Sequence, residues 1–218
     1  MNCLIKFLLT NIYLNIYKES NMKLIRSFLI VAFAVVSIGV NAQNKTNAFY
    51  GMAMPMGDTE SYISPTSFRG ANIEFEKLVN PRVGVGLLVG WNTFYEAKDR
   101  GTYPIQNGEI TSNQYRYLNA IPVQVTGKYY FAGDDAMIRP FIGLAGGTYY
   151  MEQRVDNGLF SSSAKGWTWS VAPKAGVLVP LSFRTSLALS VDYSTSFKSS
   201  DLEQQNWLGI NVGFSWDY

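Results

Sequence analysis

A strict alternation of apolar and small or polar residues closes the chain. From residue 208 onward the apolar residues all have even numbers: Leu208, Ile210, Val212, Phe214, Trp216 and Tyr218. Successive side chains of an extended strand point to opposite faces, whereas a helix would scatter these six residues around its circumference. The pattern therefore predicts a final strand over 206–218 that includes the last residue, although chain ends are more often polar and frayed.

The same period of two recurs along the chain. It is clear in 83–95, 115–131, 167–181 and 187–197, and weaker in 46–54, 68–79 and 138–151. The segment 46–54 is short and ambiguous, and the glycines at 143, 146 and 147 blur the two faces of 138–151. With the final strand this predicts eight strands, each with one apolar face and an opposite face of small and polar residues.

The predicted connections alternate in length. Short ones lie near 80–81, 133–135 and 181–185, and long polar ones at 55–67, 96–113, 152–165 and 198–205. Short turns at one end and long loops at the other are typical of outer-membrane barrels. After residue 42 there is no apolar run long enough for a membrane-spanning helix and no repeat of solenoid type. The sequence therefore predicts an all-β fold, an eight-stranded antiparallel up-and-down transmembrane β-barrel.

Aromatic residues gather near both ends of the predicted strands. Threading the strands up and down places one group near the long loops: Trp91, Tyr95, Tyr115, Tyr117, Tyr150, Trp167, Trp169, Tyr193 and Phe197. A second group lies near the short turns: Tyr129, Phe131, Trp216 and Tyr218. Amphipathic rings form such girdles at the two interfaces of a membrane.

A soluble β protein is the alternative, in particular a periplasmic calycin-like barrel that carries a small apolar ligand. Its apolar face would point inward. The positions of Trp167 and Trp169, outside or inside the barrel, distinguish the two folds.

The first 42 residues read as a leader. Residues 22–42 combine a basic start, an apolar run and a small-residue end at Val40-Asn41-Ala42, which is the layout of a secretory signal peptide. We expect residues 1–21 to reflect a start codon placed too early, or an extended leader. The barrel domain is then 43–218.

Composition narrows the functional classes. Without residues 1–42 the chain has 14 Lys and Arg against 15 Asp and Glu, a net charge of −1 with no basic tract, so nucleic acid is not an expected partner. The single cysteine, Cys3, lies in the leader. The chain has no histidine, which excludes a Ser-His-Asp triad and any histidine-based metal site. We expect no cofactor and no catalysis, and a turn at Asp134-Asp135.

Charged residues nevertheless fall on the predicted inner face: Glu74, Glu76, Arg116, Lys128, Lys174 and Asp192. Side chains fill the interior of an eight-stranded barrel, and an unpaired buried charge is costly. These residues are predicted to pair and close the lumen. The functional alternative is a narrow ion or solute path gated by the pairs, and Gly84, Gly86 and Gly90 are candidates for leaving local space or relieving strand strain.

The chain after the predicted leader, about 44–218, resembles the small outer-membrane β-barrel proteins, a porin-like family typified by the OmpA transmembrane domain. In that family the last strand has a polar residue, a glycine two positions later, and aromatics five and seven positions later. Asn211, Gly213, Trp216 and Tyr218 match this pattern.

The resemblance implies insertion into the outer membrane of a diderm bacterium by the barrel-assembly machinery, which would read these four residues. It also implies a non-catalytic structural role, with slow solute passage possible. The remaining alternative is adhesion or ligand binding by the long loops, with an unknown extracellular ligand. A closed barrel has no sheet edge, so we expect a monomer whose main contact is membrane lipid.

Overall fold

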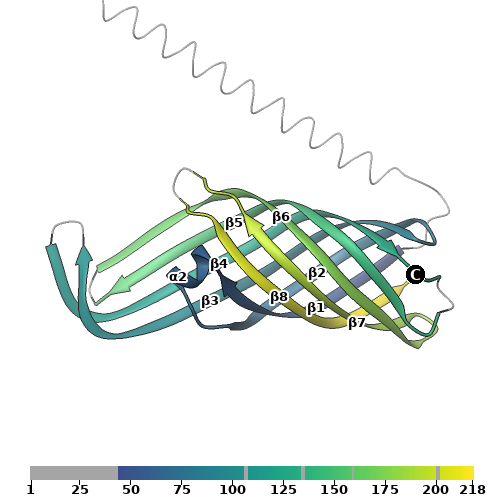
Figure 1. The fold of residues 1–218 in the computed structure, drawn as a ribbon, viewed down its shortest axis with the longest axis horizontal. Coiled ribbons are helices and arrows are strands. Elements are labelled where there is room, and N and C mark those ends of the chain that lie inside the picture. Colours follow the sequence, from purple (N-terminus) through teal and green to yellow (C-terminus); the bar gives the residue numbers. More distant parts are fainter. Residues whose placement is uncertain (1–43, 106–107, 134–135, 159, 200–201) are drawn as a thin grey trace, which may run out of the picture. The chain divides into compact units, whose positions relative to one another are not determined.

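Eight antiparallel strands form one closed barrel in the computed structural model, which describes residues 44–105, 108–133, 136–158, 160–199 and 202–218. Each strand pairs with the next one along the chain, and β1 pairs with β8 (Figure 1). The elements are β1 (Asn44–Met56), α2 (Asp58–Tyr62), β2 (Ser67–Asn80), β3 (Val83–Ile105), β4 (Gly108–Tyr130), β5 (Arg139–Asn157), β6 (Phe160–Ser182), β7 (Thr185–Ser196) and β8 (Gln205–Asp217). The predicted fold class is confirmed.

The seam between β1 and β8 closes the barrel. Its register runs without interruption from Lys45 opposite Asp217 to Met56 opposite Asn206. Beyond it, the amide of Tyr218 donates to the carbonyl of Asn44 at 3.0 Å, and the Asn44 amide donates back at 3.2 Å. The last residue is thus part of the ladder, as the alternation predicts, and β1 is longer than its sequence suggests.

The register also fixes the tilt of the strands. Neighbouring residues followed once around the barrel from Thr46 lead back to Met56, ten residues further along β1. A stagger of this kind in an eight-stranded barrel requires strands tilted by about 35–45° and leaves an interior that side chains can fill. The inner face therefore becomes a packed column, which holds the candidate site.

The outer face is apolar, as predicted. The outward positions of β1 (46–56), β7 (185–197) and β8 (208–218) carry no charged residue. Trp167 and Trp169 on β6 are each 58% exposed, so they point away from the lumen. The apolar face of this barrel is therefore its outside, the inverse of what a carrier of apolar ligands requires.

The inner face differs from the prediction. It is small and polar only in part, because large apolar side chains also point inward at two levels of the barrel. These include Phe94, Trp207 and Tyr149 at one level and Tyr130 and Phe141 at the other. The expectation of a uniformly small and polar lumen is wrong.

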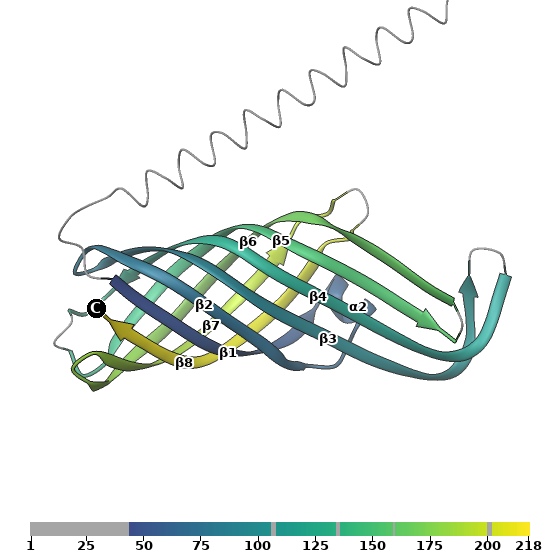
Figure 2. The same cartoon turned by 180° about the vertical axis from the view of Figure 1, so that it is seen from behind.

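The predicted long loops at 96–113 and 152–165 are also wrong over most of their length. β3 pairs with β4 up to Ile105 opposite Gly108, and β5 pairs with β6 up to Asn157 opposite Phe160. Figure 1 and, from the opposite side, Figure 2 show both hairpins reaching past the ends of β1, β2, β7 and β8. We call this side of the barrel the hairpin end, and the side with the connections β2–β3, β4–β5 and β6–β7 the short-turn end.

Two further predicted regions are the loop 55–67 and the residues that the structure does not describe. The predicted loop 55–67 contains α2, which at five residues is too short to show a helical period in the sequence. The predicted leader, 1–42, and the Asp134-Asp135 turn lie outside the described residues. Among the residues that the structure describes, no helix has the length and apolarity needed to cross a membrane.

Amide exchange tests the extended hairpins. Residues 96–98 and 152–156 lie in the ladder, so half or more of their amides should exchange slowly in the folded barrel, as expected for hydrogen-bonded strands. Residue-resolved exchange in detergent micelles is the measurement. Uniformly fast exchange across both segments would show that they are mobile loops and contradict this register.

Candidate functional site

The centre of the lumen holds an ion-paired cluster of Glu74, Glu76 and Lys128, which we call the triad. The Lys128 ammonium lies 2.7 Å from Glu74 Oε2 and 2.8 Å from Glu76 Oε2. All three side chains are at most 3% exposed. Since a buried charge without a partner is strongly destabilising, this arrangement accounts for the charges that the inner face carries.

The remaining oxygens of the triad also have partners. Thr126 Oγ1 donates to Glu74 Oε1 at 2.6 Å, and Tyr130 Oη donates to Glu76 Oε1 at 2.7 Å. Asn47 Nδ2 adds a longer bond to Glu76 at 3.2 Å. Side chains from β1, β2 and β4 thus satisfy two carboxylates and link three strands across the lumen.

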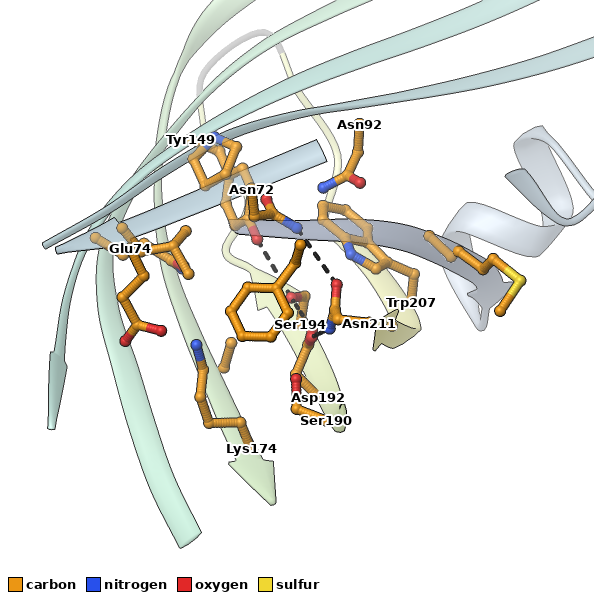
Figure 3. A pocket seen from close by; sticks show the side chains of 18 of the residues that line it. Asn72, Glu74, Asn92, Tyr149, Lys174, Ser190, Asp192, Ser194, Trp207 and Asn211 are labelled. Atoms are coloured by element: carbon orange, nitrogen blue, oxygen red, sulfur yellow. Dashed lines mark hydrogen bonds between the residues drawn. The ribbon is translucent and has the colours of Figure 1, made fainter. Parts of the chain in front are cut away.

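A small polar cavity of about 40 Å³ lies between the triad and the hairpin end. Lys174 and Asp192 line it from β6 and β7 (Figure 3). Asn211 donates to Asp192 Oδ1 at 2.6 Å and accepts a bond from Asn72 at 3.3 Å. Lys174 acts electrostatically on Glu74, and no ion pair of Lys174 occurs among the described residues. A cavity of this size has room for ordered water and for little else.

An apolar layer closes the lumen on the short-turn side of the triad. It consists of Phe49, Leu78, Tyr130, Phe141, Leu178 and Ala188. The rings of Tyr130 and Phe141 lie 5.6 Å apart, and the Arg139 guanidinium lies 4.0 Å from the centre of the Tyr130 ring. Aromatic rings and cations stacked in this way are attractive and leave little open space.

A second apolar layer closes the hairpin end. Trp207 is its centre, with Phe94 at 5.5 Å and Tyr149 at 5.2 Å between ring centroids. The segment after α2 reaches into this layer, since Ile63 is fully buried against it. Thr59 Oγ1 accepts a bond from the Asn206 amide at 2.7 Å, which fixes α2 to β8. The connection between β1 and β2 therefore acts as a plug in the mouth of the barrel.

Arg116 belongs to this plug and not to the triad. Its guanidinium donates to the carbonyl of Tyr62 at 2.8 Å and to Gln114 Oε1 at 2.6 Å, and it lies 5.3 Å from the Tyr62 ring. Burial raises the pKa of Tyr62 to about 12, although the charge of Arg116 opposes the shift. The phenol thus stays a neutral donor, and it bonds to the carbonyl of Arg154 at 3.2 Å.

The structure therefore divides the predicted charge network into parts. Glu74, Glu76 and Lys128 make direct contacts, Lys174 and Asp192 face the neighbouring cavity, and Arg116 lies at the hairpin end. Their inward direction agrees with the prediction, but a single connected network does not form. The strand alternation gives the direction of each side chain, and only the register gives its level in the barrel.

The position of Gly84 on the inner face is explained by its contact with Glu76. A Cβ atom at this position would collide with the Glu76 carboxylate, which occupies the space above the Gly84 backbone. Glycine here lets a charged side chain fold flat against the neighbouring strand. The missing side chain of Gly84 therefore leaves the space that the Glu76 carboxylate occupies.

The predicted aromatic girdles lie on the outer face. Trp91, Phe131 and Phe197 are each at least half exposed, and the rings of Tyr95 and Tyr117, and of Tyr150 and Trp167, contact each other there. In the predicted assembly signal, Trp216 also points outward, Asn211 points into the cavity, and Gly213 lies so close to the Ala48 carbonyl of β1 that no side chain would fit.

Sequence reasoning missed the residues that close the lumen. Phe94, Tyr149 and Trp207 have the inward parity of their strands, but the prediction rested on the outward residues and took the inner face to be polar. Large aromatics at inward positions of several strands are the signal that identifies such a layer. Among the described residues, no group of acidic, cysteine or histidine side chains is suited to hold a metal ion.

Comparison with known proteins gives a fold and no closer relative. No family model and no curated protein matches the sequence. The structure is similar to Ail, the attachment invasion locus protein of Yersinia pestis, with a TM-score of 0.52 and 12% identity over 81% of this chain and 99% of that one. Ail has also been solved with the heparin analogue sucrose octasulfate.

Two other solved structures show the same fold. Neisserial surface protein A has a TM-score of 0.50 and 14% identity over 81% of this chain and 97% of that one. The outer membrane protein OprG of Pseudomonas aeruginosa also has a TM-score of 0.50 and 14% identity, over 81% of this chain and 96% of that one. This chain thus has the fold of the small eight-stranded outer-membrane β-barrels.

Replacing Lys128 tests the triad. Lys128→Met leaves Glu74 and Glu76 buried without their cation, so the free energy of unfolding should fall by about 3–5 kcal/mol. Urea unfolding of the reconstituted protein, followed by the loss of the compact band on unheated gels, is the measurement. Lys174→Met is the matched control with a smaller expected effect, and equal losses in the two variants would contradict the role assigned to the triad.

Proposed function

We propose that this protein is a non-catalytic outer-membrane barrel with a closed lumen, and that its β3–β6 sheet is a binding surface on the outside of the cell. The observation that carries the proposal is the combination of a lumen closed at two levels with strands that extend beyond the barrel at one end. The barrel provides the anchor and the sheet provides the surface.

The apolar outer face supports a membrane location. On β6, the outward residues from Trp169 to Leu181 are uncharged. At about 3.3 Å per residue and a tilt near 40°, this stretch spans about 30 Å, comparable to the apolar band of about 25 Å in known barrels. The girdle aromatics then lie at the two interfaces, and the proposed signal peptide supplies export.

The connections support one orientation in the membrane. Known barrels have short turns on the periplasmic side and longer connections outside the cell. The short-turn end therefore faces the periplasm in our proposal, and the β3–β4 and β5–β6 hairpins face the surroundings of the cell. In our proposal the barrel-assembly machinery reads the final strand, including Trp216 and Tyr218.

The interior argues against solute passage as the main role. Ion pairs and two apolar layers occupy the lumen, and the cavity between them has a volume of about 40 Å³. Pockets that bind organic ligands measure about 300–1,000 Å³, so a calycin-like carrier function has even less support. The absence of histidine from the sequence remains the argument against catalysis.

The edges of the extended sheet offer a specific kind of contact. Register pairing between β2 and β3 ends at Asn92, and pairing between β6 and β7 ends at Ser170, with one further bond from Phe197 to Trp169. Beyond these residues, and within the described part of the chain, β3 pairs only with β4 and β6 pairs only with β5. Free strand edges bind extended peptides by adding a strand, so a polypeptide is the proposed class of partner.

The two edges are not equivalent. The β3 edge has a bulge between Lys98 and Gly101 and a run of charged residues, which are devices that prevent strand pairing. The β6 edge reads Ser161-Ser162-Ser163-Ala164, and its register with β5 is free of bulges. We therefore assign the peptide contact to β6.

Charge argues against a sulfated sugar as the ligand, despite the compound bound to Ail. The segments beyond the barrel at the hairpin end, 57–69, 96–116, 152–165 and 197–204, contain seven basic and nine acidic residues. Several basic side chains are also paired, as Arg154 is with Asp156 and Lys165 with Glu152, both at 2.9 Å. A polyanion requires a surplus of positive charge, which this surface lacks.

A planar-bilayer recording tests the closed lumen. The inserted protein should show no steady ion conductance above the bare bilayer, because both apolar layers must open for ions to pass. Trp207→Ala and Lys128→Ala, alone and combined, show whether removing one layer or the triad opens a path. Steady conductance of the unmodified protein that changes when Lys128 or Glu74 is substituted would support slow passage and contradict the closed lumen.

A proline substitution tests the β6 edge. The backbone polar groups of every second residue point to the same side of a strand. The Trp169 carbonyl faces β7, so the Ser163 amide points to that same side of β6, where β7 no longer pairs. Ser163→Pro therefore removes a donor from the free edge, while the bonds of β6 to β5 remain. Titration of the reconstituted protein with an uncharged peptide of alternating Val and Ser should slow exchange of the Ser161, Ser163 and Lys165 amides. Ser163→Ala keeps the donor and should bind alike, and equal binding by Ser163→Pro would contradict the assignment.

A further inference from the structure

Two connections at the short-turn end expose large apolar side chains. Phe183 is 94% exposed and Met137 is 86% exposed, and Ile138 and Leu181 are each more than half exposed. One connection joins β4 to β5 and the other joins β6 to β7. Since β5 and β6 pair down to Arg139 opposite Leu178, the two connections lie beside each other on the rim. We call Met137, Ile138, Leu181 and Phe183 the rim patch.

The third connection at this end, between β2 and β3, is polar and carries no large apolar side chain. The turn between β2 and β3 is Asn80-Pro81-Arg82, with residues that suit a tight turn in water. Its Arg82 amide bonds to Asn80 Oδ1 at 2.8 Å, a local bond typical of such turns. The rim patch therefore does not follow from the geometry of a short connection. A group of exposed large apolar residues indicates a contact surface.

We propose that the rim patch inserts into the headgroup region of the periplasmic leaflet, and that Arg184 contacts lipid phosphate there. The inference rests on the proposed membrane location. The patch continues the lipid-facing surface, since Leu181 is the last outward residue of β6, and Ile138, just before β5, has the same parity as the outward, half-exposed Ile142 on β5. Arg184 follows Phe183 directly and lines the open hollow at this mouth.

Physical chemistry favours lipid over a protein partner for this patch. An apolar side chain next to a basic one suits the boundary between acyl chains and anionic headgroups, where both find their preferred surroundings. The interfacial layer adds roughly 5–8 Å to each side of the hydrocarbon core. That distance accommodates side chains one or two residues beyond the aromatic girdle at the short-turn end. The barrel is then held more deeply along β4–β7 than at the polar turn of β2 and β3.

Nitroxide labelling tests the proposal, because Cys3 is the only cysteine of the sequence. In a Cys3→Ser background, single labels are placed at 137, at 183, at Arg82 as the matched turn control, and at Leu189 in the middle of the apolar face. The protein is reconstituted in vesicles of phosphatidylethanolamine and phosphatidylglycerol. Collision rates with oxygen, which partitions into lipid, and with a water-soluble nickel complex are compared at each site.

Labels at 137 and 183 should have an oxygen-to-nickel collision ratio between that of Leu189, where oxygen collisions exceed nickel collisions severalfold, and that of Arg82, where nickel collisions dominate. Arg184→Gln should shift the 183 label toward nickel in the anionic vesicles. If the Leu189 label is in lipid but the labels at 137 and 183 match the Arg82 label, the rim patch proposal is overturned and the membrane location stands. The same conclusion follows if another copy of the protein shields the labels at 137 and 183 from both reagents. If 189 itself is in water, the membrane location fails and the patch fails with it.

Discussion

The backbone hydrogen bonds between β1 and β8 are the interaction on which the rest of this structure depends. A bilayer core offers no water to unpaired amides and carbonyls, so a sheet can lie in it only when it has no open edge. Residues 45–56 pair with 206–217 without a break, and Tyr218 extends the ladder to the chain end. The C-terminal strand is therefore part of the closure, which explains why the sequence alternates to its last residue.

Closure also sets the chemistry of the interior. The tilt and stagger of eight strands leave a lumen of side-chain width, so each inward residue must pack against residues of distant strands. The triad meets this requirement with two carboxylates, one ammonium and donors from Thr126 and Tyr130. A buried ion pair contributes little net stability compared with apolar packing, but loss of one partner is severe. We infer that the triad, which joins side chains of β2 and β4 across β3, helps to specify the registers of β2–β3 and β3–β4, and that the apolar layers supply most of the packing energy.

The parts of this structure that the sequence predicts are those in contact with a uniform solvent. In the proposed membrane location, lipid requires an apolar residue at every second position, and this alternation makes the strands around Val85, Leu189 and Val212 recognisable in the sequence. The hairpin extensions have water on both faces, so Ser161-Ser162-Ser163 carries no alternation and reads as a loop. The lumen is equally hard to predict, because the pairing of Glu74 with Lys128, and the separation of Arg116 from both, depend on register. Trp207 and Phe94 have the inward parity of their strands, but they were not identified from the sequence, and strand parity alone does not show that they meet.

A disulfide across the seam tests the central claim most directly. Asn47 and Ser215 face each other across β1 and β8, and both side chains are at most 1% exposed inside the barrel. In a Cys3→Ser background, the protein with Asn47→Cys and Ser215→Cys should form this disulfide in the outer-membrane fraction, within the compact band that shifts only on heating. Free thiols in that fraction, or a soluble protein without a heat-shifted band, would contradict a barrel closed by β1 and β8 in a membrane.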